Sequence, residues 1–410
     1  MSGNSDNDRP TPLFSPACIQ NPYPTYREHA TRGPVQRLSA LPRTWGVFRH
    51  QVFATLIRDR RLSSDRTAEL FRSYDPGLAE FHEFRSHLKQ WLLFLDSPEH
   101  ARLRRKLNAG FSPSAIQSLR PRVEEIAQDL MGEFGDATDV DLMRSFAHPL
   151  PVGVICRLLG IPTALYPRCV KLSDDFAAWF ADPRRSAVTA RTAAAAVLEL
   201  TEIMAETVRT AESSSGNELM RVLLELEREP NAVSREALHA QCVLLLIAGH
   251  ETTRGLIGNA IYLVLTQAPE VVRAFDEEAL LRSTVEEVLR FESPIQTIGR
   301  TVTEDLQYQE VTLTAGETLF FMIGAANRDP EQFSDPDKFD PRRPHNRHLA
   351  FGGDDHVCLG GTLARMEAQV ALRSLFSRFP HALLRCGLPE WYPGFRLRTL
   401  RSLHAQLEPS

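Results

Sequence analysis

Residues 350–367 read AFGGDDHVCLGGTLARME and place one thiol, Cys358, between a histidine and a pair of glycines. The residues that follow, TLARMEAQVALRSLF, have apolar side chains at helical spacing. Cys358 is therefore expected just before a helix N-terminus, where free N–H groups and the helix dipole favour a thiolate. Such a sulfur is a nucleophile or a metal ligand. The loop also leaves room for a flat, bulky group to approach its backbone, because it contains Gly352, Gly353, Gly360 and Gly361. Taken alone, a cysteine beside glycines is more often structural.

The composition is that of an ordinary globular protein. The chain has 410 residues, 43% of them hydrophobic and 24% charged, which is enough to bury a sizeable core. The net charge of −5 argues against wholesale nucleic-acid binding. The longest apolar runs, such as CVLLLIAG at 242–249, are shorter than the ~18–20 residues of a membrane span, and the first residues do not resemble a signal peptide. We therefore expect a soluble, cytoplasmic protein that uses neither a nucleic acid nor a membrane as its partner.

The sequence predicts one large domain. The polar, proline-containing start MSGNSDNDRPTPLFSP indicates a loose N-terminal segment over residues 1–20, and residues 21–410 are expected to form the single large domain. Six cysteines are scattered without CxxC spacing, which indicates neither a disulfide framework nor a four-thiolate zinc site. Reduced thiols in the cytoplasm fit this pattern.

Hydrophobic periodicity predicts a mainly α fold with small β-sheets. Strand-like alternation is confined to short pieces such as 311–322, where residues 314–317 look like a hairpin turn between VTL and TLFFM. Residues 329–343 are too rich in proline and aspartate for regular structure. The helical runs are 122–134, 192–211, 217–227, 234–266, 278–291 and 362–379.

Residues 244–259, LLLIAGHETTRGLIGN, form an unusual stretch inside the longest helical run. Each glycine in a helix interior costs about 1 kcal/mol relative to alanine, so its glycines need a reason. Thr252 is expected to return its hydroxyl to the carbonyl of Ala248, which opens the helix locally beside the acid Glu251. Such a groove could hold a small polar ligand, with a route for protons. The alternative is that the glycines serve a tight helix crossing.

Residues 282–290, RSTVEEVLR, contain two further patterns. Ser283 and Glu286 have the spacing of a capping box, which could start a helical turn at that point. Glu287 and Arg290 share one helix face at a spacing of three residues. The residues alone favour an exposed pair of little energetic value.

These stretches together resemble the cytochrome P450 family of haem-thiolate monooxygenases, in the family's order over roughly residues 90–380. The resembling motifs are AGHETT at 248–253, Glu287-x-x-Arg290, ANRDP at 326–330, FSDPDKF at 333–339 and FGGDDHVCLGG at 351–361. The resemblance implies the family's mainly α fold, with the haem between a long distal helix and the cysteine loop. It points to the bacterial, separately reduced type.

The resemblance also implies roles for particular residues. Cys358 would be the axial ligand of the iron of haem b, with O2 as co-substrate, and Glu251 and Thr252 would deliver protons during oxygen activation. Glu287 and Arg290 would be structural. The residues that match family positions in contact with the haem propionates are His100, Arg104, Arg300 and His356.

The resemblance implies only a broad class of substrate and of electron-transfer partner. The expected substrate is an apolar or aromatic small molecule, free or tethered to a carrier protein, such as an intermediate of secondary metabolism. Electrons would come from a ferredoxin or flavodoxin, for which the basic run 342–348 would border a docking face. Aromatic residues of the expected pocket segments are more often core than substrate contacts, and they are Phe81, Phe84, Trp91, Phe94, Phe176, Trp179 and Phe180.

One departure from the family and two rival functions remain. The family usually has glycine where this chain has Asp354, and aspartate is one of the few other residues that tolerate a left-handed backbone. His356 and Cys358, with Asp354 and Asp355 nearby, could instead hold zinc in a non-catalytic protein. A peroxide-driven haem-thiolate enzyme is the nearer rival, although the sequence HETT favours oxygen with an electron donor.

Overall fold

The computed structural model describes residues 12–72, 80–135, 138–182, 185–212, 218–228, 233–385 and 387–408. The α-helices are α1 (Pro16–Gln20), α2 (Tyr23–Thr31), α3 (His50–Leu56), α4 (Thr67–Leu70), α5 (Glu80–Lys89), α6 (Glu99–Gly110), α7 (Pro113–Gly132), α8 (Pro149–Leu159), α9 (Tyr166–Ala181), α10 (Ala187–Glu212), α11 (Glu218–Arg228), α12 (Arg235–Gln267), α13 (Glu278–Phe291), α14 (Ile323–Ala326) and α15 (Gly361–Arg378). The strands are β1 (Val35–Arg37), β2 (Thr44–Val47), β3 (Leu62–Ser63), β4 (Asp139–Asp141), β5 (Thr297–Val302), β6 (Leu306–Tyr308), β7 (Val311–Leu313), β8 (Thr318–Met322), β9 (Leu383–Leu384) and β10 (His404–Gln406). Each of the six predicted helical runs falls on a helix, and the mainly α fold with small sheets is confirmed.

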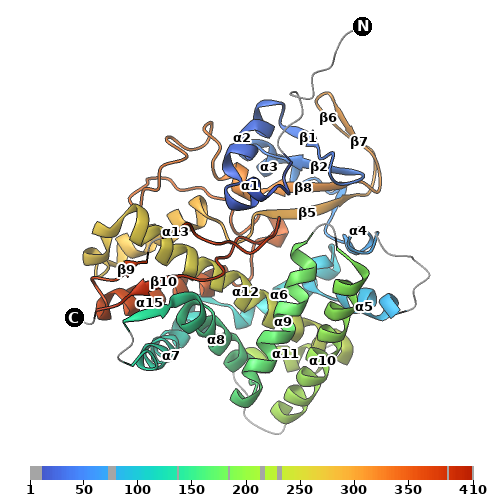
Figure 1. Cartoon of the computed structure of the whole chain (residues 1–410). Coiled ribbons are helices and arrows are strands. Elements are labelled where there is room, and N and C mark those ends of the chain that lie inside the picture. Colours follow the sequence, from blue (N-terminus) through green and yellow to red (C-terminus); the bar gives the residue numbers. More distant parts are fainter. Residues whose placement is uncertain are drawn as a thin grey trace.

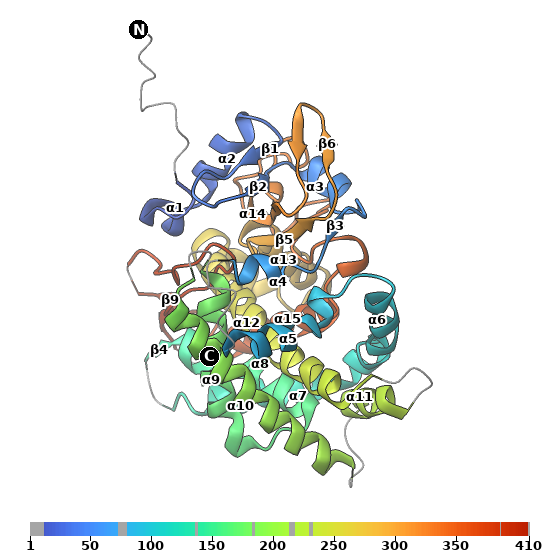
Figure 2. The same ribbon diagram turned by 90° about the vertical axis from the view of Figure 1, so that its right-hand side faces the viewer.

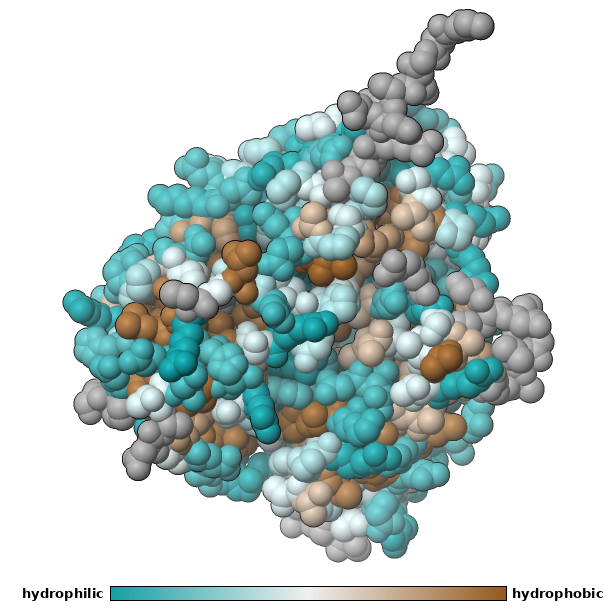
Figure 3. Space-filling view, viewed as in Figure 1, coloured by the Kyte–Doolittle hydropathy of each residue, from teal (hydrophilic) through white to brown (hydrophobic). Residues whose placement is uncertain are grey.

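Two regions make up the molecule. One contains the five-stranded sheet β1-β2-β8-β5-β3 with α1, α2 and α3 around it, and the other consists of the long helices (Figures 1 and 2). A large apolar core joins the helices, and two smaller apolar clusters lie beside the sheet. The face seen in Figure 3 is mainly hydrophilic, with its apolar residues in separate patches.

The longest helix, α12, runs through the interior of the helical region (Figure 2). It begins where the hydroxyl of Ser234 accepts the N–H of Ala237, and it packs against α8, α9, α10, α11 and α15. Because neighbours surround it, α12 carries apolar residues on nearly every side rather than along one stripe. Within the described residues, no helix combines the length and apolar composition that crossing a bilayer requires.

The predicted hairpin at 311–322 is wrong in its pairing. The turn exists, with Gly316 at φ 81, but β7 pairs with β6, whereas β8 pairs with β2 and β5 in the larger sheet. All residues of β8 are buried, so this strand needs a neighbour on each edge and cover on both faces. A hairpin with the half-exposed β7 could not supply them.

The segment expected to be loose, residues 1–20, is ordered in its second part. Residues 1–11 lie outside the described residues. In the remainder, Leu13 and Cys18 are buried, and Ser15 caps α1. Arg398 donates hydrogen bonds to the carbonyls of the last two residues of α1, at 2.6 and 3.0 Å. The helix α1 is therefore held against the C-terminal segment that contains Arg398.

Candidate active site

The cysteine loop ends at a helix start, as predicted. A short 3₁₀ turn, Asp354–His356, precedes Cys358, and α15 follows at Gly361. The N–H of Cys358 donates to the carbonyl of Phe351 at 3.0 Å, and the N–H of Gly360 donates to the Cys358 sulfur. A Cβ added at Gly360 would meet no protein atom within 4 Å. The thiol is accessible and the loop around it leaves room for a bulky group.

The thiol is better suited to bind a metal than to act as a nucleophile. Although Cys358 is exposed on one side, the protein atoms packed around its sulfur desolvate the thiolate and raise its pKa, and the Gly360 N–H and the charges of Arg104 and Arg365 offset only part of this rise. A thiol with a raised pKa is mostly protonated near neutral pH and reacts poorly. A metal cation overcomes this obstacle, because a coordinated thiol loses its proton outright.

Three basic residues predicted as cofactor contacts converge beside this loop. The rings of His100 and His356 stack with centroids 3.8 Å apart, and Ser64 Oγ shares a hydrogen bond of 2.9 Å with His356 Nε2. Burial, then the charges of Arg300 and His100, lower the pKa of His356 to about 2. Burial also lowers the pKa of Arg300 to about 10. At this pKa His356 is a neutral hydrogen-bonding group, whereas Arg300 remains a buried cation, and a buried cation favours an anionic partner.

The fourth predicted contact, Arg104, lies one helical turn after His100 on α6. Its Nε donates to Asn108 Oδ1 at 3.2 Å, and burial lowers its pKa while the Cys358 thiolate charge raises it. Arg104 is thus close enough to Cys358 for their charges to interact, whereas Arg102 and Arg105 are exposed. His100 Nε2 is buried without a hydrogen-bond partner among the described residues.

Arg66 adds a cation that the sequence analysis missed. Its Nη1 donates to the Gly299 carbonyl at 2.9 Å, and its charge acts on both Arg300 and His356. Arg66 stands outside the resembling motifs, in the ordinary stretch SSDR, so no sequence signal distinguished it from a surface arginine.

Asp354 adopts the left-handed backbone that the sequence analysis anticipated. Its φ is 58°, and that of Gly352 is 73°. The Asp354 side chain is exposed, and its charge reaches Arg300. The aspartate therefore keeps the turn of a glycine while placing a carboxylate at the rim of the basic group.

Replacing Asp354 by glycine is expected to raise the haem reduction potential. The change removes a negative charge beside the basic group and relieves left-handed strain on the order of 1 kcal/mol. Asp354→Asn removes the charge but keeps a side chain, so it should raise the potential without the gain in stability. Potentiometric titration and thermal unfolding of both variants separate the two effects, and unchanged potentials would show that solvent screens the carboxylate.

The helix α12 presents one open face. Thr252 Oγ1 donates to the carbonyl of Ala248 at 2.9 Å, as predicted, and Ala248 is exposed inside a helix that is otherwise largely buried. The glycines have another purpose, because a Cβ at Gly249 would lie 2.9 Å from Ile155 of α8. Gly249 therefore allows α12 and α8 to cross closely, which was the alternative explanation for the glycines. The polar face is made by the hydroxyl of Thr252 and the carbonyl of Ala248.

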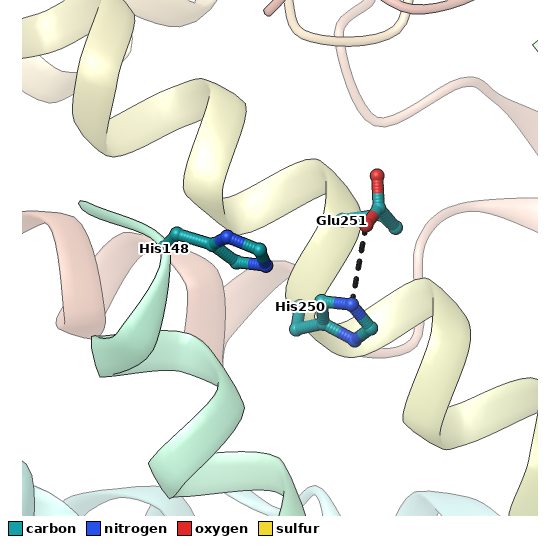
Figure 4. A group of neighbouring side chains, drawn as sticks. All are labelled: His148, His250 and Glu251. Atoms are coloured by element: carbon teal, nitrogen blue, oxygen red, sulfur yellow. Dashed lines mark ion pairs between the residues drawn. The ribbon is translucent and has the colours of Figure 1, made fainter. Parts of the chain in front are cut away.

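The acid Glu251 lies beside Thr252 and is bound by two cationic or ionisable neighbours. Its Oε1 lies 3.2 Å from His250 Nε2, and its Oε2 lies 2.9 Å from Arg254 Nη2. Figure 4 shows His148, from the start of α8, next to this pair. Burial would raise the pKa of Glu251, but the adjacent His250 and the charge of Arg254 outweigh it and hold the pKa at about 2.

Asp174 of α9 connects Glu251 with the surface. Arg254 Nη1 lies 3.0 Å from Asp174 Oδ1, and the Asp174 side chain is 43% exposed. Burial and then the negative charge of Glu251 raise the pKa of Asp174 to about 6. A carboxyl group that exchanges protons near neutral pH therefore stands between solvent and the buried acid. Sequence spacing gave no indication of this contact, because α9 and α12 are far apart in the chain.

The pair Glu287 and Arg290 is fully buried, against the reading from residues alone and as the resemblance implied. Two bonds of 2.8 Å join their side chains, and Arg343 Nε lies 3.1 Å from Glu287 Oε1. Arg343 is therefore a structural residue and does not belong to an exposed docking face. The predicted capping box is also wrong, because Ser283 lies inside α13 and its hydroxyl donates to the carbonyls of Leu280 and Pro341.

The aromatic residues of the expected pocket segments are mostly core. Phe84, Trp91 and Trp179 are at most 1% exposed and belong to one large cluster. Only Phe180 is half-buried among the residues named above, and it stacks on Phe176 with centroids 5.6 Å apart.

A cysteine loop before a helix, buried basic residues beside it and a polar face on an interior helix are the features that a haem-thiolate oxidoreductase needs. Residues 173–389 match the family model for Cytochrome P450. The chain is 32% identical to 6-deoxyerythronolide B hydroxylase of Saccharopolyspora erythraea, over 94% of this chain and 96% of that protein. It is 35% identical to Vitamin D(3) 25-hydroxylase of Pseudonocardia autotrophica, over 92% and 91%.

Solved structures agree with this assignment. P450BioI in complex with a hexadec-9Z-enoic acid ligated acyl carrier protein superposes with a TM-score of 0.88 at 28% identity, covering 96% of this chain and 99% of that one. CYP109E1 from Bacillus megaterium in complex with testosterone gives 0.85 at 30% identity, covering 96% and 100%. The chain belongs to the cytochrome P450 family. It is a monooxygenase that uses haem b and O2.

The residues present fit a haem. An iron porphyrin with two propionates requires a thiol that ionises on a metal, buried groups that can bind an anion and a loop open to a bulky group. Within the described part of the chain, Cys358, the buried Arg300 with the unpartnered His100 Nε2, and the glycine loop supply these. The zinc alternative does not fit the cysteine loop, because His356 is stacked on His100 and bonded to Ser64. Among the described residues, the His, Cys, Asp and Glu group with metal-like spacing is instead His148, His250 and Glu251. The peroxide-driven alternative is not favoured by the relatives, which are monooxygenases and hydroxylases by name.

Proposed function

We propose that this P450 oxidises an apolar or aromatic small molecule, an intermediate of secondary metabolism, with electrons from a separate ferredoxin or flavodoxin. The observation that carries the proposal is the accessible thiol of Cys358 beside the buried His100 of α6 and the buried Arg300 of β5. The proposal places the catalytic domain at residues 21–410, with α1 packed onto it, in the cytoplasm, where the five described cysteines would stay reduced as they are here.

In this proposal Cys358 ligates the iron, and four residues neutralise the two propionates. The haem supplies oxygen activation when bound, and the thiolate makes it suited to cleave the O–O bond. The four residues are His100, Arg104, Arg300 and His356. Arg365 connects the cysteine loop to α13. Its Cζ lies 4.3 Å from the centroid of the Phe351 ring, and its Nε lies 2.7 Å from Glu286 Oε1.

Proton supply falls to the polar face of α12. Thr252 holds a hydroxyl on the open face of the helix, and Glu251 immediately precedes it in the chain, in contact with His250 and Arg254. Asp174 takes a proton from solvent, because its pKa of about 6 allows both states near neutral pH. Because its pKa of about 2 keeps Glu251 ionised, it would carry this proton only transiently and release it towards Thr252.

Thr252→Ala is expected to lower product formation at least ~10-fold while reductant consumption continues, because positioned proton transfer contributes ~10²–10⁴-fold to rates. Haem content should not change. Thr266→Ala is the matched control, since Thr266 makes the same bond to a carbonyl four residues back, on the same helix, at 2.7 Å. Measuring product formed per NADPH consumed decides the matter, and unchanged coupling would show that another group supplies the protons.

The relatives support a bulky apolar substrate. They include, by name, 6-deoxyerythronolide B hydroxylase and Vitamin D(3) 25-hydroxylase, and one solved neighbour is in complex with a hexadec-9Z-enoic acid ligated acyl carrier protein. A free and a carrier-tethered substrate therefore both remain within the proposal. The position oxidised and the reaction subtype follow from the substrate.

The donor is proposed to dock near the exposed part of the basic run 342–348. Arg342 and Arg347 are exposed, while Arg343 and His348 are bound to glutamates of α13. Arg342→Glu with Arg347→Glu should slow reduction by ferredoxin and weaken its dependence on salt, because surface charges steer association within ~8–10 Å.

Stopped-flow reduction at low and high ionic strength measures this effect. Arg144→Glu with Arg273→Glu is the charge-matched control, because both side chains are exposed outside this run. Equal reduction rates in the two double variants would place the docking face elsewhere.

Turnover with a ferredoxin, its reductase and NADPH, compared with turnover on hydrogen peroxide alone, tests the proposed function itself. We expect product with the reductase system at a higher rate than with peroxide. Product formed with peroxide alone, and none with donors, would replace the monooxygenase with a peroxygenase.

A further inference from the structure

Three arginines that the proposed chemistry does not use lie buried around one carboxylate. Arg66, Arg185 and Arg396 are 3%, 5% and 2% exposed. Arg185 Nη1 lies 3.3 Å from Glu69 Oε1, and Arg396 Nη2 lies 3.4 Å from Glu69 Oε2. The arginines come from the start of α4, the connection between α9 and α10, and the C-terminal segment. Segments distant in the chain thus bring positive charge to one place.

The charges in this group do not balance. Three guanidinium groups and one carboxylate leave an excess of two positive charges. Burial and the charges of Arg396 and Arg300 lower the pKa of Arg66 well below its usual range, and burial lowers that of Arg396 to about 10. Buried cations that lack a counter-ion are costly, so a further anion would relieve the group.

The hydrogen-bond donors do not balance either. Among the described residues, Arg66 Nε, Arg396 Nε, and both Nε and Nη2 of Arg185 are buried without an acceptor. The Nε–Nη2 edge of an arginine matches the two oxygens of a carboxylate. The two contacts with Glu69 are also longer than the ~2.7–2.9 Å of a good charge-assisted bond. If these arginines served only to stabilise the fold, their donors would be expected to have acceptors. Instead, the Nε–Nη2 edge of Arg185 has none among the described residues.

The group lies next to the proposed haem site. Arg66 Nη1 donates to the carbonyl of Gly299, the residue before Arg300. Two residues before Arg66, Ser64 holds the ring of His356. The guanidinium groups of Arg66 and Arg396 both lie over the half-buried ring of Phe180, at 5.9 and 5.2 Å from its centroid. The buried arginines and the ring of Phe180 therefore lie next to the residues proposed to contact the propionates.

We propose that Arg66, Arg185 and Arg396 bind the carboxylate group of the substrate, whose apolar body lies against Phe180. The substrate is thus an organic acid, which narrows the proposed function and rests on it. Glu69 holds Arg185 and Arg396 in place until the acid binds. The free edge of Arg185 takes the two carboxylate oxygens, and an ester or alcohol of the same shape finds no such partner.

Calorimetric titration of the haem-loaded enzyme tests this preference. The probes are octanoate, dodecanoate and hexadecanoate, each compared with its methyl ester, and dodecyl phosphate. At least one acid should bind about tenfold or more tightly than its ester, because hydrogen bonds to a buried charge discriminate by that much. The spin-state shift of the ferric haem gives a second readout of the same binding.

Variants assign the preference to the arginines. Arg185→Gln and Arg396→Gln should each weaken binding of the acid about tenfold and leave the ester unchanged. Arg185→Lys keeps the charge but loses the planar edge, so its affinity for the acid should be intermediate. Arg168→Gln is the control, because Arg168 lies on α9 in an exposed pair with Glu199.

The outcomes separate this inference from the proposed function. Imidazole binding and the carbon monoxide spectrum show in each variant whether the haem and its thiolate ligand are intact. If the wild-type protein showed neither signal, the proposed function would be contradicted, and the carboxylate inference would not be the cause. When the haem site is intact, three outcomes would overturn the inference. They are equal affinity for every acid and its ester, no binding of any acid, and a preference for the acid that persists in both glutamine variants. Tighter binding of dodecyl phosphate than of dodecanoate would replace the carboxylate by a phosphate and overturn it also.

Discussion

Replacing Glu287 by glutamine is expected to destabilise the protein by ~3–5 kcal/mol. The Glu287 carboxylate is 0% exposed and receives Arg290, also 0% exposed, together with Arg343 and Asn346. Without its charge, two buried guanidinium groups remain with no adjacent anion, and the connection between α13 and residues 335–346 is weakened. Urea unfolding of the purified protein measures the change, and loss of bound haem should accompany it.

The matched control for Glu287→Gln lies on the same helix. Arg282 pairs with Glu278 at 3.7 Å, and these side chains are 58% and 42% exposed. Arg282→Gln should cost about 0–1 kcal/mol, because exposed pairs contribute little. Similar costs for the two variants would mean that the buried network is no more than an ordinary ion pair.

Replacing Cys358 by serine is expected to remove thiolate ligation and to lower turnover by more than ~100-fold. Loss of a group that only orients a metal ligand costs ~10–100-fold, and loss of the ligand itself costs more. A serine hydroxyl keeps the size of the thiol but does not ionise in this loop, where even the thiol has a raised pKa. Product formation under the donor system measures the activity.

Cys18→Ala serves as the control for the cysteine change. Cys18 is buried in α1 and belongs to the apolar cluster beside the sheet. Turnover of this variant should match the wild type once its haem content is equal. A Cys358→Ser protein that keeps wild-type turnover would remove Cys358 from the chemistry.

The sequence predicted the parts of the site that depend on local structure. Residues near one another in the chain, such as Thr252 and the carbonyl of Ala248, or Cys358 and the start of α15, are placed by the helix itself. The left-handed backbone of Asp354 followed from the same kind of local reasoning. The long helices were predictable because their apolar periodicity extends over many turns.

The parts that sequence reasoning missed depend on tertiary contacts. Asp174 meets Glu251 only because α9 packs against α12, and Arg66 reaches Arg300 only because α4 begins beside β5. The pairing of β7 and β8 with different partners was also decided by the surrounding sheet rather than by the turn between them. Arg343 looked exposed within a basic run, yet the buried charge of Glu287 draws it inwards. One sequence without its fold carries no signal for any of these contacts.

The absorption spectrum of the reduced wild-type protein under carbon monoxide tests the central claim most directly. If Cys358 ligates the iron of haem b as a thiolate, the protein is coloured and its Soret band shows the strong red shift of thiolate ligation. A colourless or zinc-containing protein, or a coloured one whose carbon monoxide complex lacks that shift, would contradict the account.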